Sequence, residues 1–212
     1  MLTIDEFNRG INFWNTKPRW PNDLHNAFYI SLQNALHNNW EIENPFNEEL
    51  IRIIINPLQT WVAIRPKPQN YIIDNYLKSI DILNKIWRED IAPVSKGDIT
   101  TIEYRSVKRF IETVKNIKGV NSYVFPSKFS HFLIPKIFPV YDNTALAGIK
   151  NNYEEYYEMF RSEWYETDGD VKNQLITAIE NKIKSTGGDV LNNYPYQTKA
   201  VEICLIGRQH NH

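Results

Sequence analysis

Three side chains of different chemistry lie within one short stretch of the chain: Lys128, His131 and Asp142. A carboxylate such as Asp142 can stabilise a developing positive charge or activate a water or lysine nucleophile, and a lysine can be that nucleophile or contact phosphate. Lys128 and His131 are three residues apart and share one face of a helix. We interpret Lys128 and Asp142 as candidate catalytic residues, with His131 facing the same groove.

Each of these residues also has an ordinary structural interpretation. Asp142 can be the N-cap of a following helix. Lys128 can belong to a solvated basic surface. A lone histidine such as His131 is commonly a hydrogen-bonded core or surface residue.

The elements that must position these groups follow from local signals. A helix beginning at Thr100 or Thr101 ends before Gly119, which suits a left-handed position at a helix C-terminus. A second helix, over about 125–134, carries Lys128 and His131 and is ended by Pro135. A proline-containing connector then leads to Asp142, just before a short helix over 144–149.

This layout resembles the helix-hairpin-helix DNA glycosylase superfamily over residues 119–145. In that family a glycine-rich hairpin binds a DNA phosphate through its backbone amides, and a catalytic aspartate stands at the head of a later helix. Gly119 and Val120 match the hairpin and Asp142 matches the aspartate. Asn121 stands where the family has a second glycine, and an asparagine tolerates the left-handed conformation at some cost. Lys128 lies a turn beyond the position of the nucleophilic lysine of bifunctional members.

The resemblance implies a duplex or flipped-base nucleic acid as partner. The reaction would be cleavage of an N-glycosidic bond, with Asp142 stabilising the cationic sugar. The flipped base would enter a pocket that aromatic side chains can line. No cysteine cluster for an iron–sulfur site exists, and no cofactor is expected. The same stretch is similar to uncharacterised bacterial and phage-associated proteins.

The formal net charge of −1 is the sum of unequal parts. Residues 103–150 hold eight basic and three acidic residues, a net charge of +5, and residues 151–182 hold three basic and eight acidic residues, a net charge of −5. Such a basic block can follow a phosphate backbone. We therefore predict a nucleic-acid-binding set of Lys108, Arg109, Lys118, Gly119, Asn121 and His131. Alternatively, the basic helix packs beside the acidic one and the two charges compensate.

Apolar residues elsewhere recur at helical spacing, and no segment shows the alternation of a strand. We expect an all-α fold, an orthogonal array of roughly ten short helices with a glycosylase-like core. It forms a single domain over 1–212, with a subdivision into 1–98 and 99–212 as the alternative. The other expected helices span about 4–15, 22–38, 48–64, 70–88, 151–166, 170–184 and 198–208, and Pro57 should kink or split the third of these.

Composition limits the remaining choices. The lone Cys204, an acidic start and the lack of a long apolar run indicate a cytoplasmic protein without a membrane segment. The terminal His210 and His212 do not make a metal site. With 6 Trp, 12 Tyr and 10 Phe, aromatic residues are plentiful, and most fall on helical stripes. Two other functions stay open: a non-enzymatic protein-interaction domain, and a helical enzyme acting on a small ligand in an aromatic pocket.

Overall fold

The computed structural model describes residues 1–37, 44–145 and 152–210, and within these ranges it contains α-helices and no strand. The all-α prediction is therefore confirmed. The expected helix over 144–149 falls almost entirely outside the described residues. The described helices are α1 (Ile4–Asn15), α2 (Asn26–His37), α3 (Glu48–Thr60), α4 (Gln69–Ile86), α5 (Tyr104–Lys118), α6 (Val124–Leu133), α7 (Tyr153–Glu166), α8 (Gly169–Lys184) and α9 (Tyr196–Gln209).

Two helix ends follow the signals in the sequence. The side chain of Thr3 accepts from the amide of Glu6 at 3.2 Å, and the Glu6 carboxylate accepts from the amide of Thr3 at 3.1 Å, so α1 begins with a complete capping box. At the end of α5, Gly119 adopts a left-handed φ of 64°.

Two other helix ends differ from expectation, because residues other than glycine adopt left-handed backbone angles. Leu24 and His25 have φ values of 52° and 66°, so α2 begins only at Asn26. Helix α3 continues through Pro57 and ends at Thr60, because Val62 turns the chain with a φ of 59°. The amides of Val62 and Ala63 then bond to the carbonyls of Gln59 and Leu58, which is a Schellman motif.

Helix α4 continues without a break into a π-helical turn, Trp87–Ile91, and a 3₁₀ turn, Ala92–Val94, so the helical path extends beyond residue 88, where the expected helix ends. None of the helices in the described ranges is long and apolar enough to cross a membrane.

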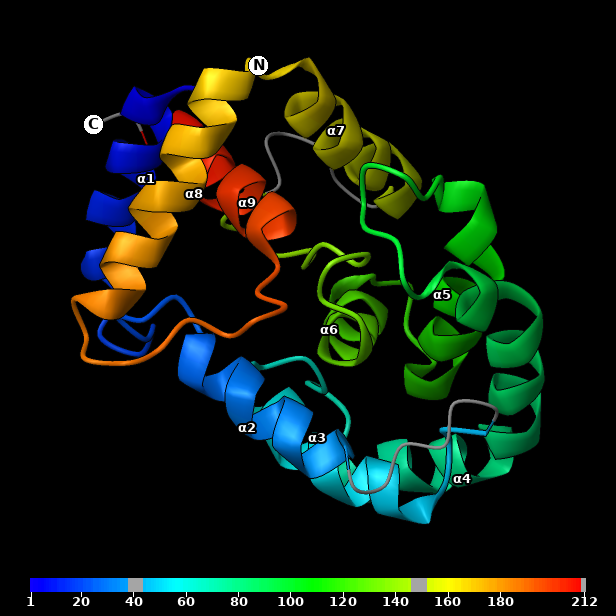
Figure 1. Cartoon of the computed structure of the whole chain (residues 1–212). Coiled ribbons are helices and arrows are strands. Elements are labelled where there is room, and N and C mark those ends of the chain that lie inside the picture. The colour runs from blue at the N-terminus through cyan, green and yellow to red at the C-terminus, as the bar shows by residue number, and fades with distance from the viewer. Residues whose placement is uncertain (38–43, 146–151, 211–212) are drawn as a thin grey trace.

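Figure 1 shows the helices arranged around α6. Helix α1, from the start of the chain, packs along α9, from its end. Two glycines allow this close approach. A Cβ atom on Gly207 would lie 1.8 Å from the backbone oxygen of Glu6, and one on Gly10 would lie 2.0 Å from the backbone oxygen of Ile203.

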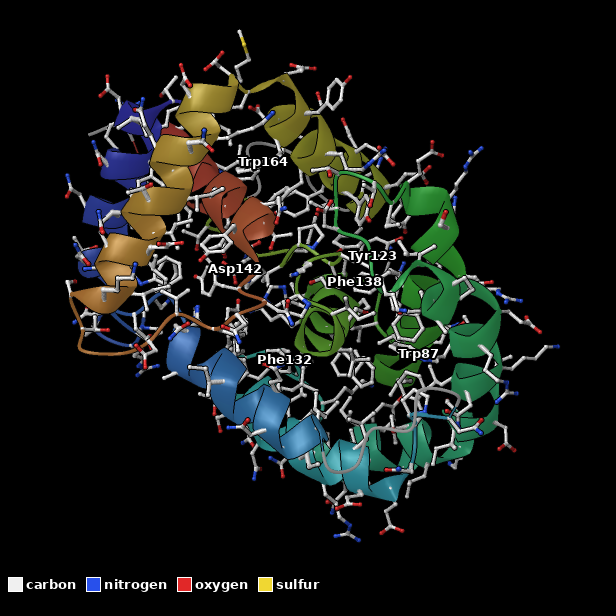
Figure 2. All side chains as sticks on the ribbon, in the orientation of Figure 1. Trp87, Tyr123, Phe132, Phe138, Asp142 and Trp164 are labelled. Carbon is white, nitrogen blue, oxygen red and sulfur yellow. The ribbon has the colours of Figure 1, made fainter. Side chains whose placement is uncertain are left out.

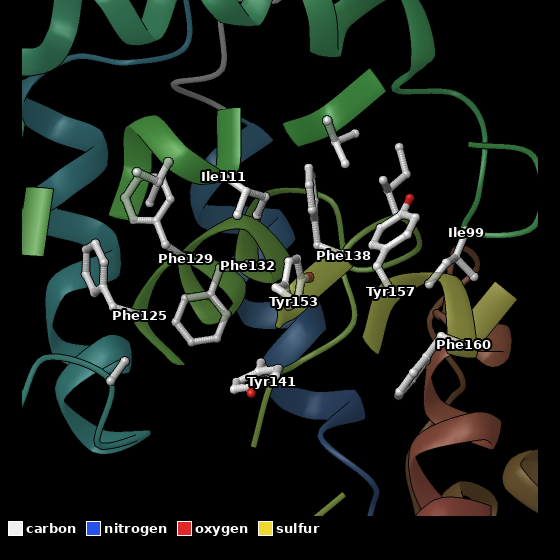
Figure 3. Close-up of a cluster of buried hydrophobic side chains, with 14 of the residues drawn as sticks. Ile99, Ile111, Phe125, Phe129, Phe132, Phe138, Tyr141, Tyr153, Tyr157 and Phe160 are labelled. Atoms are coloured by element: carbon white, nitrogen blue, oxygen red, sulfur yellow. The ribbon is translucent and has the colours of Figure 1, made fainter. Parts of the chain in front are cut away.

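Aromatic side chains from α6 and α7 make up much of the core around the connector that leads to Asp142 (Figure 3). Tyr153 and Tyr156 of α7 are fully buried, and their hydroxyls donate to the carbonyls of Pro139 and Val140 at 2.8 and 2.9 Å. Tyr153 and Tyr156 are therefore core residues that fix the backbone just before Asp142.

Candidate functional site

Lys128 and Asp142, which the sequence singles out as candidate catalytic residues, are in contact. The ammonium of Lys128 lies 3.1 Å from Oδ2 of Asp142. The side chain of Lys128 is 7% exposed and that of Asp142 is 34% exposed, so the carboxylate is the more accessible partner. The pair joins α6 to the segment that follows the connector.

Backbone groups and a neighbouring threonine hold the pair in place. Lys128 also donates to the carbonyl of Trp61 at 2.8 Å, one residue beyond the end of α3. The second oxygen of Asp142, Oδ1, accepts from the amide of Thr144 at 3.1 Å and from its hydroxyl at 2.9 Å. Asp142 therefore caps a local turn and also carries an ion pair, while the helix that it is expected to cap falls almost entirely outside the described residues.

The ion pair keeps Asp142 ionised. Burial acts to raise the pKa of this carboxyl, but Lys128 and the two bonds from Thr144 outweigh it, so the pKa lies below its ordinary value. At neutral pH the group is a carboxylate, which is the form that stabilises positive charge.

The pair lies in the wall of a cleft of about 750 Å³, which we call the aromatic cleft. Figure 2 shows Asp142 between α9 and α2. The rings that line the cleft come from α1, α2 and the loops beside them, and from the end of α3. They are Trp14, Trp20, His25, Phe28 and Trp61. Tyr123, Phe125, Phe129, Phe138 and Tyr141, the rings nearest the predicted site in the sequence, pack in the core region instead.

His25 is an unusual member of this lining. Its ring centroid lies 4.6 Å from that of Trp61 and 5.2 Å from that of Trp14. Its Nδ1 atom is buried and has no hydrogen-bond partner in the described residues. Burial, followed by the charges of Lys199 and Lys128, lowers the pKa of His25, so the ring is neutral. His25 and Val62 both line the cleft, and both are non-glycine residues with left-handed backbone angles.

A second carboxylate lines the same cleft. Glu202 of α9 accepts from the ammonium of Lys199 at 2.6 Å, and the side chains of the two residues are 14% and 1% exposed. Burial acts to lower the pKa of Lys199, but Glu202 and the Tyr29 hydroxyl outweigh it and the pKa is raised.

His131 lies behind this second pair and not in the groove. It is 1% exposed, its Nδ1 lies 2.7 Å from the carbonyl of Phe138, and its Nε2 lies 2.7 Å from the Tyr29 hydroxyl. A carbonyl only accepts, so Nδ1 carries the proton and Nε2 accepts from Tyr29. Both ring nitrogens are therefore used inside the protein.

The predicted nucleic-acid-binding cations differ in exposure. Lys108 and Arg109 are about half exposed, at 55% and 48%, and they pair with carboxylates: Lys108 with Glu154 of α7, and Arg109 with Glu89 and Asp90 of the π-helical turn. Lys118 is buried and donates to the carbonyl of Ala63. The basic and acidic helices thus meet through Lys108 and Glu154.

Gly119 and Asn121 are the two predicted nucleic-acid-binding residues of the hairpin. Gly119 is left-handed, and a Cβ atom there would lie 2.9 Å from the Tyr71 hydroxyl. Asn121 is exposed and is not among the left-handed residues of the described chain, which besides glycine are Leu24, His25 and Val62.

The residues that sequence reasoning missed come from distant parts of the chain. Trp14, Trp61 and Glu202 meet at the cleft only through packing of α1, α3 and α9. One local signal exists, because Lys199 and Glu202 are three residues apart on one helix face. No group of three or more potential metal ligands occurs in the part of the chain that the structure describes.

Comparisons of the chain with protein-family models, with curated proteins and with solved structures found no match.

Proposed function

We propose that this protein cleaves an N-glycosidic bond, holding a planar base in the aromatic cleft while the Asp142 carboxylate stabilises the positive charge that develops on the sugar. The observation that carries the proposal is the Lys128–Asp142 pair in the wall of a cleft lined with aromatic rings. The resemblance of residues 119–145 to helix-hairpin-helix glycosylases supports the same chemistry.

The dimensions and chemistry of the cleft suit this substrate. Its volume of about 750 Å³ lies within the range of small-ligand sites. Trp61, Trp20 and Phe28 offer faces on which a base can stack, and each such stack is worth about 1–3 kcal/mol. His25 lines the same cleft, and its Nδ1 has no hydrogen-bond partner among the described residues.

Release of free base from a panel of duplexes carrying damaged or mismatched bases tests the proposal. We expect one or more to be cleaved, and we expect Asp142→Asn to lower kcat by about 100-fold or more, because the charge opposite the sugar is lost. Asp168→Asn, at the N-cap of α8 and outside the cleft, is the matched control and should leave kcat unchanged. Wild-type protein that releases no base from any duplex or nucleoside contradicts the proposal.

A second candidate is cleavage of a small nucleoside instead of a polymer. One observation favours it: Lys108 and Arg109 are already paired with carboxylates of the chain, and Lys118 is buried. Free nucleosides in the same panel distinguish the two, because a nucleoside hydrolase releases base from them and an enzyme that acts on duplex DNA does not.

A further inference from the structure

The geometry points to Glu202 as a second catalytic carboxylate of the aromatic cleft, which takes the proton from the water that attacks the sugar. This inference rests on the proposed N-glycosidic cleavage and assigns a role that neither Lys128 nor Asp142 can fill.

Glu202 reaches the cleft from a different side than Asp142. It belongs to α9, whereas Asp142 follows the connector after α6, and both side chains line the cleft. Burial is the main cause that raises the pKa of the Tyr156 phenol, and the charges of Glu202 and Asp142 raise it further. Both carboxylates therefore lie near that one ring. Two carboxylates on one cleft are the arrangement that glycoside hydrolysis uses.

The two carboxylates are held differently, and this difference separates their roles. Both oxygens of Asp142 are engaged, Oδ2 by Lys128 and Oδ1 by Thr144. Glu202 is held through Oε2 by Lys199, and its other oxygen, Oε1, takes no part in that ion pair. Asp142 is therefore suited to act as a fixed charge, and Glu202 has an oxygen available to receive a proton.

A line of buried hydrogen bonds fixes the orientation of Glu202. Lys199 donates to Glu202 and also contacts the Tyr29 hydroxyl, which donates to His131, which in turn donates to the carbonyl of Phe138. Lys199, Tyr29, His131 and Phe138 are all buried. Lys199, Tyr29 and His131 are therefore positioning residues for the Glu202 carboxylate.

The step balances with water alone. The water oxygen bonds to the sugar carbon, and the bond from that carbon to the base nitrogen breaks, leaving its electron pair on the nitrogen. Glu202 takes one proton from the water and passes it to the departing base. The products are the hydroxylated sugar and the protonated base, and Glu202 returns to a carboxylate.

The test compares Glu202→Gln with wild type on whichever substrate the wild type cleaves. We expect kcat to fall by about 100-fold or more with KM changed only a few-fold, because general-base catalysis contributes about that much. Azide is an anionic nucleophile that needs no base, so it should restore turnover of Glu202→Gln and give a glycosyl azide. Glu180→Gln removes a half-buried carboxylate that pairs with Lys184 outside the cleft, and it should behave as wild type.

A second variant guards against misfolding, since Glu202→Gln leaves the buried Lys199 without its partner. The double variant Lys199→Met, Glu202→Gln removes both charges, and we expect it to fold and to show the same loss and the same rescue by azide. Wild-type turnover together with unchanged turnover of Glu202→Gln overturns the role of Glu202 and leaves the proposed function standing. A loss of turnover that azide does not restore also overturns this role. A wild type without turnover on any substrate overturns the proposed function itself, and the role of Glu202 with it.

Discussion

His131 is a residue whose type suggests a role in binding or catalysis but whose hydrogen bonds show a structural role. Both ring nitrogens are bonded inside the protein, to the Phe138 carbonyl and to the Tyr29 hydroxyl. Burial first, and then the charges of Lys199 and Lys128, lower its pKa to about 3 against the hydrogen bond to Phe138, so the imidazole is neutral at neutral pH. It is one link in the line of hydrogen bonds that runs from the Phe138 carbonyl towards Glu202.

The lowered pKa of His131 predicts a loss of stability in acid. The unfolded chain binds a proton near the ordinary pKa of histidine and the folded protein only near pH 3, so between these values the unfolded state binds more protons and stability falls as pH falls. Between pH 7 and pH 5 this single group should cost about 2 kcal/mol. His131→Gln keeps a donor and an acceptor but does not titrate.

Urea unfolding of wild type and His131→Gln at both pH values measures the effect. We expect the variant to lose about 2 kcal/mol less than wild type on acidification. Any acid loss that remains includes the contribution of His25, which is also buried and neutral. Equal losses in the two proteins would mean that His131 is protonated in the fold at pH 5.

At the level of single residues, the sequence predicted one half of the site. Lys128 and Asp142 are close in the chain and joined by a helix and a connector, so their contact follows from local structure. Glu202, His25 and Trp61 reach the cleft through packing between elements far apart in sequence, and no local pattern indicates where such contacts form.

Helix ends show the same limit at the scale of elements. The start of α1 and the end of α5 carry the residues that such ends favour, and both were predictable. The start of α2 and the end of α3 depend on left-handed Leu24, His25 and Val62. Leucine and the β-branched valine disfavour that conformation, so the surrounding packing must impose it at Leu24 and Val62.

The contact between α1 and α9 depends on two glycines. A Cβ atom on Gly207 would overlap the backbone oxygen of Glu6 at 1.8 Å, and backbone atoms cannot move away without separating the helices. We therefore expect Gly207→Ala to destabilise the protein by about 3 kcal/mol or more, although alanine is the better helix former.

Denaturant unfolding of Gly207→Ala beside Gly169→Ala measures this prediction. Gly169 begins α8, and a Cβ atom there meets nothing within 4 Å, so alanine should be neutral or stabilising by up to about 1 kcal/mol. A stability of Gly207→Ala equal to that of Gly169→Ala would contradict the close packing of α1 on α9.

At the scale of the whole molecule, the net charge is near zero because positive and negative side chains compensate, and the ion pairs of Lys108 and Arg109 on α5 are partly exposed to solvent. Lys108 and Arg109 sit on α5 with about half of each side chain exposed, and their partners Glu154 and Asp90 come from other elements. Such surface ion pairs are worth about 0–1 kcal/mol, so a phosphate can replace the carboxylate at little cost. Lys118 donates to a backbone carbonyl in the interior, so it cannot exchange that partner for a phosphate.

The half-exposed Lys108 and Arg109 are therefore expected to contact phosphate, and the buried Lys118 is not. Duplex binding at low and high salt tests this difference. Each phosphate contact contributes about 0.9 to the slope of log affinity against log salt. We expect the double variant Lys108→Ala, Arg109→Ala to bind duplex more weakly at low salt and to lower the magnitude of that slope by about 2. Lys118→Met should leave the slope unchanged. If the wild type binds no duplex even at low salt, residues 103–145 do not contact duplex phosphate, and of the two proposed substrates only the small nucleoside remains, for which only the aromatic cleft is needed.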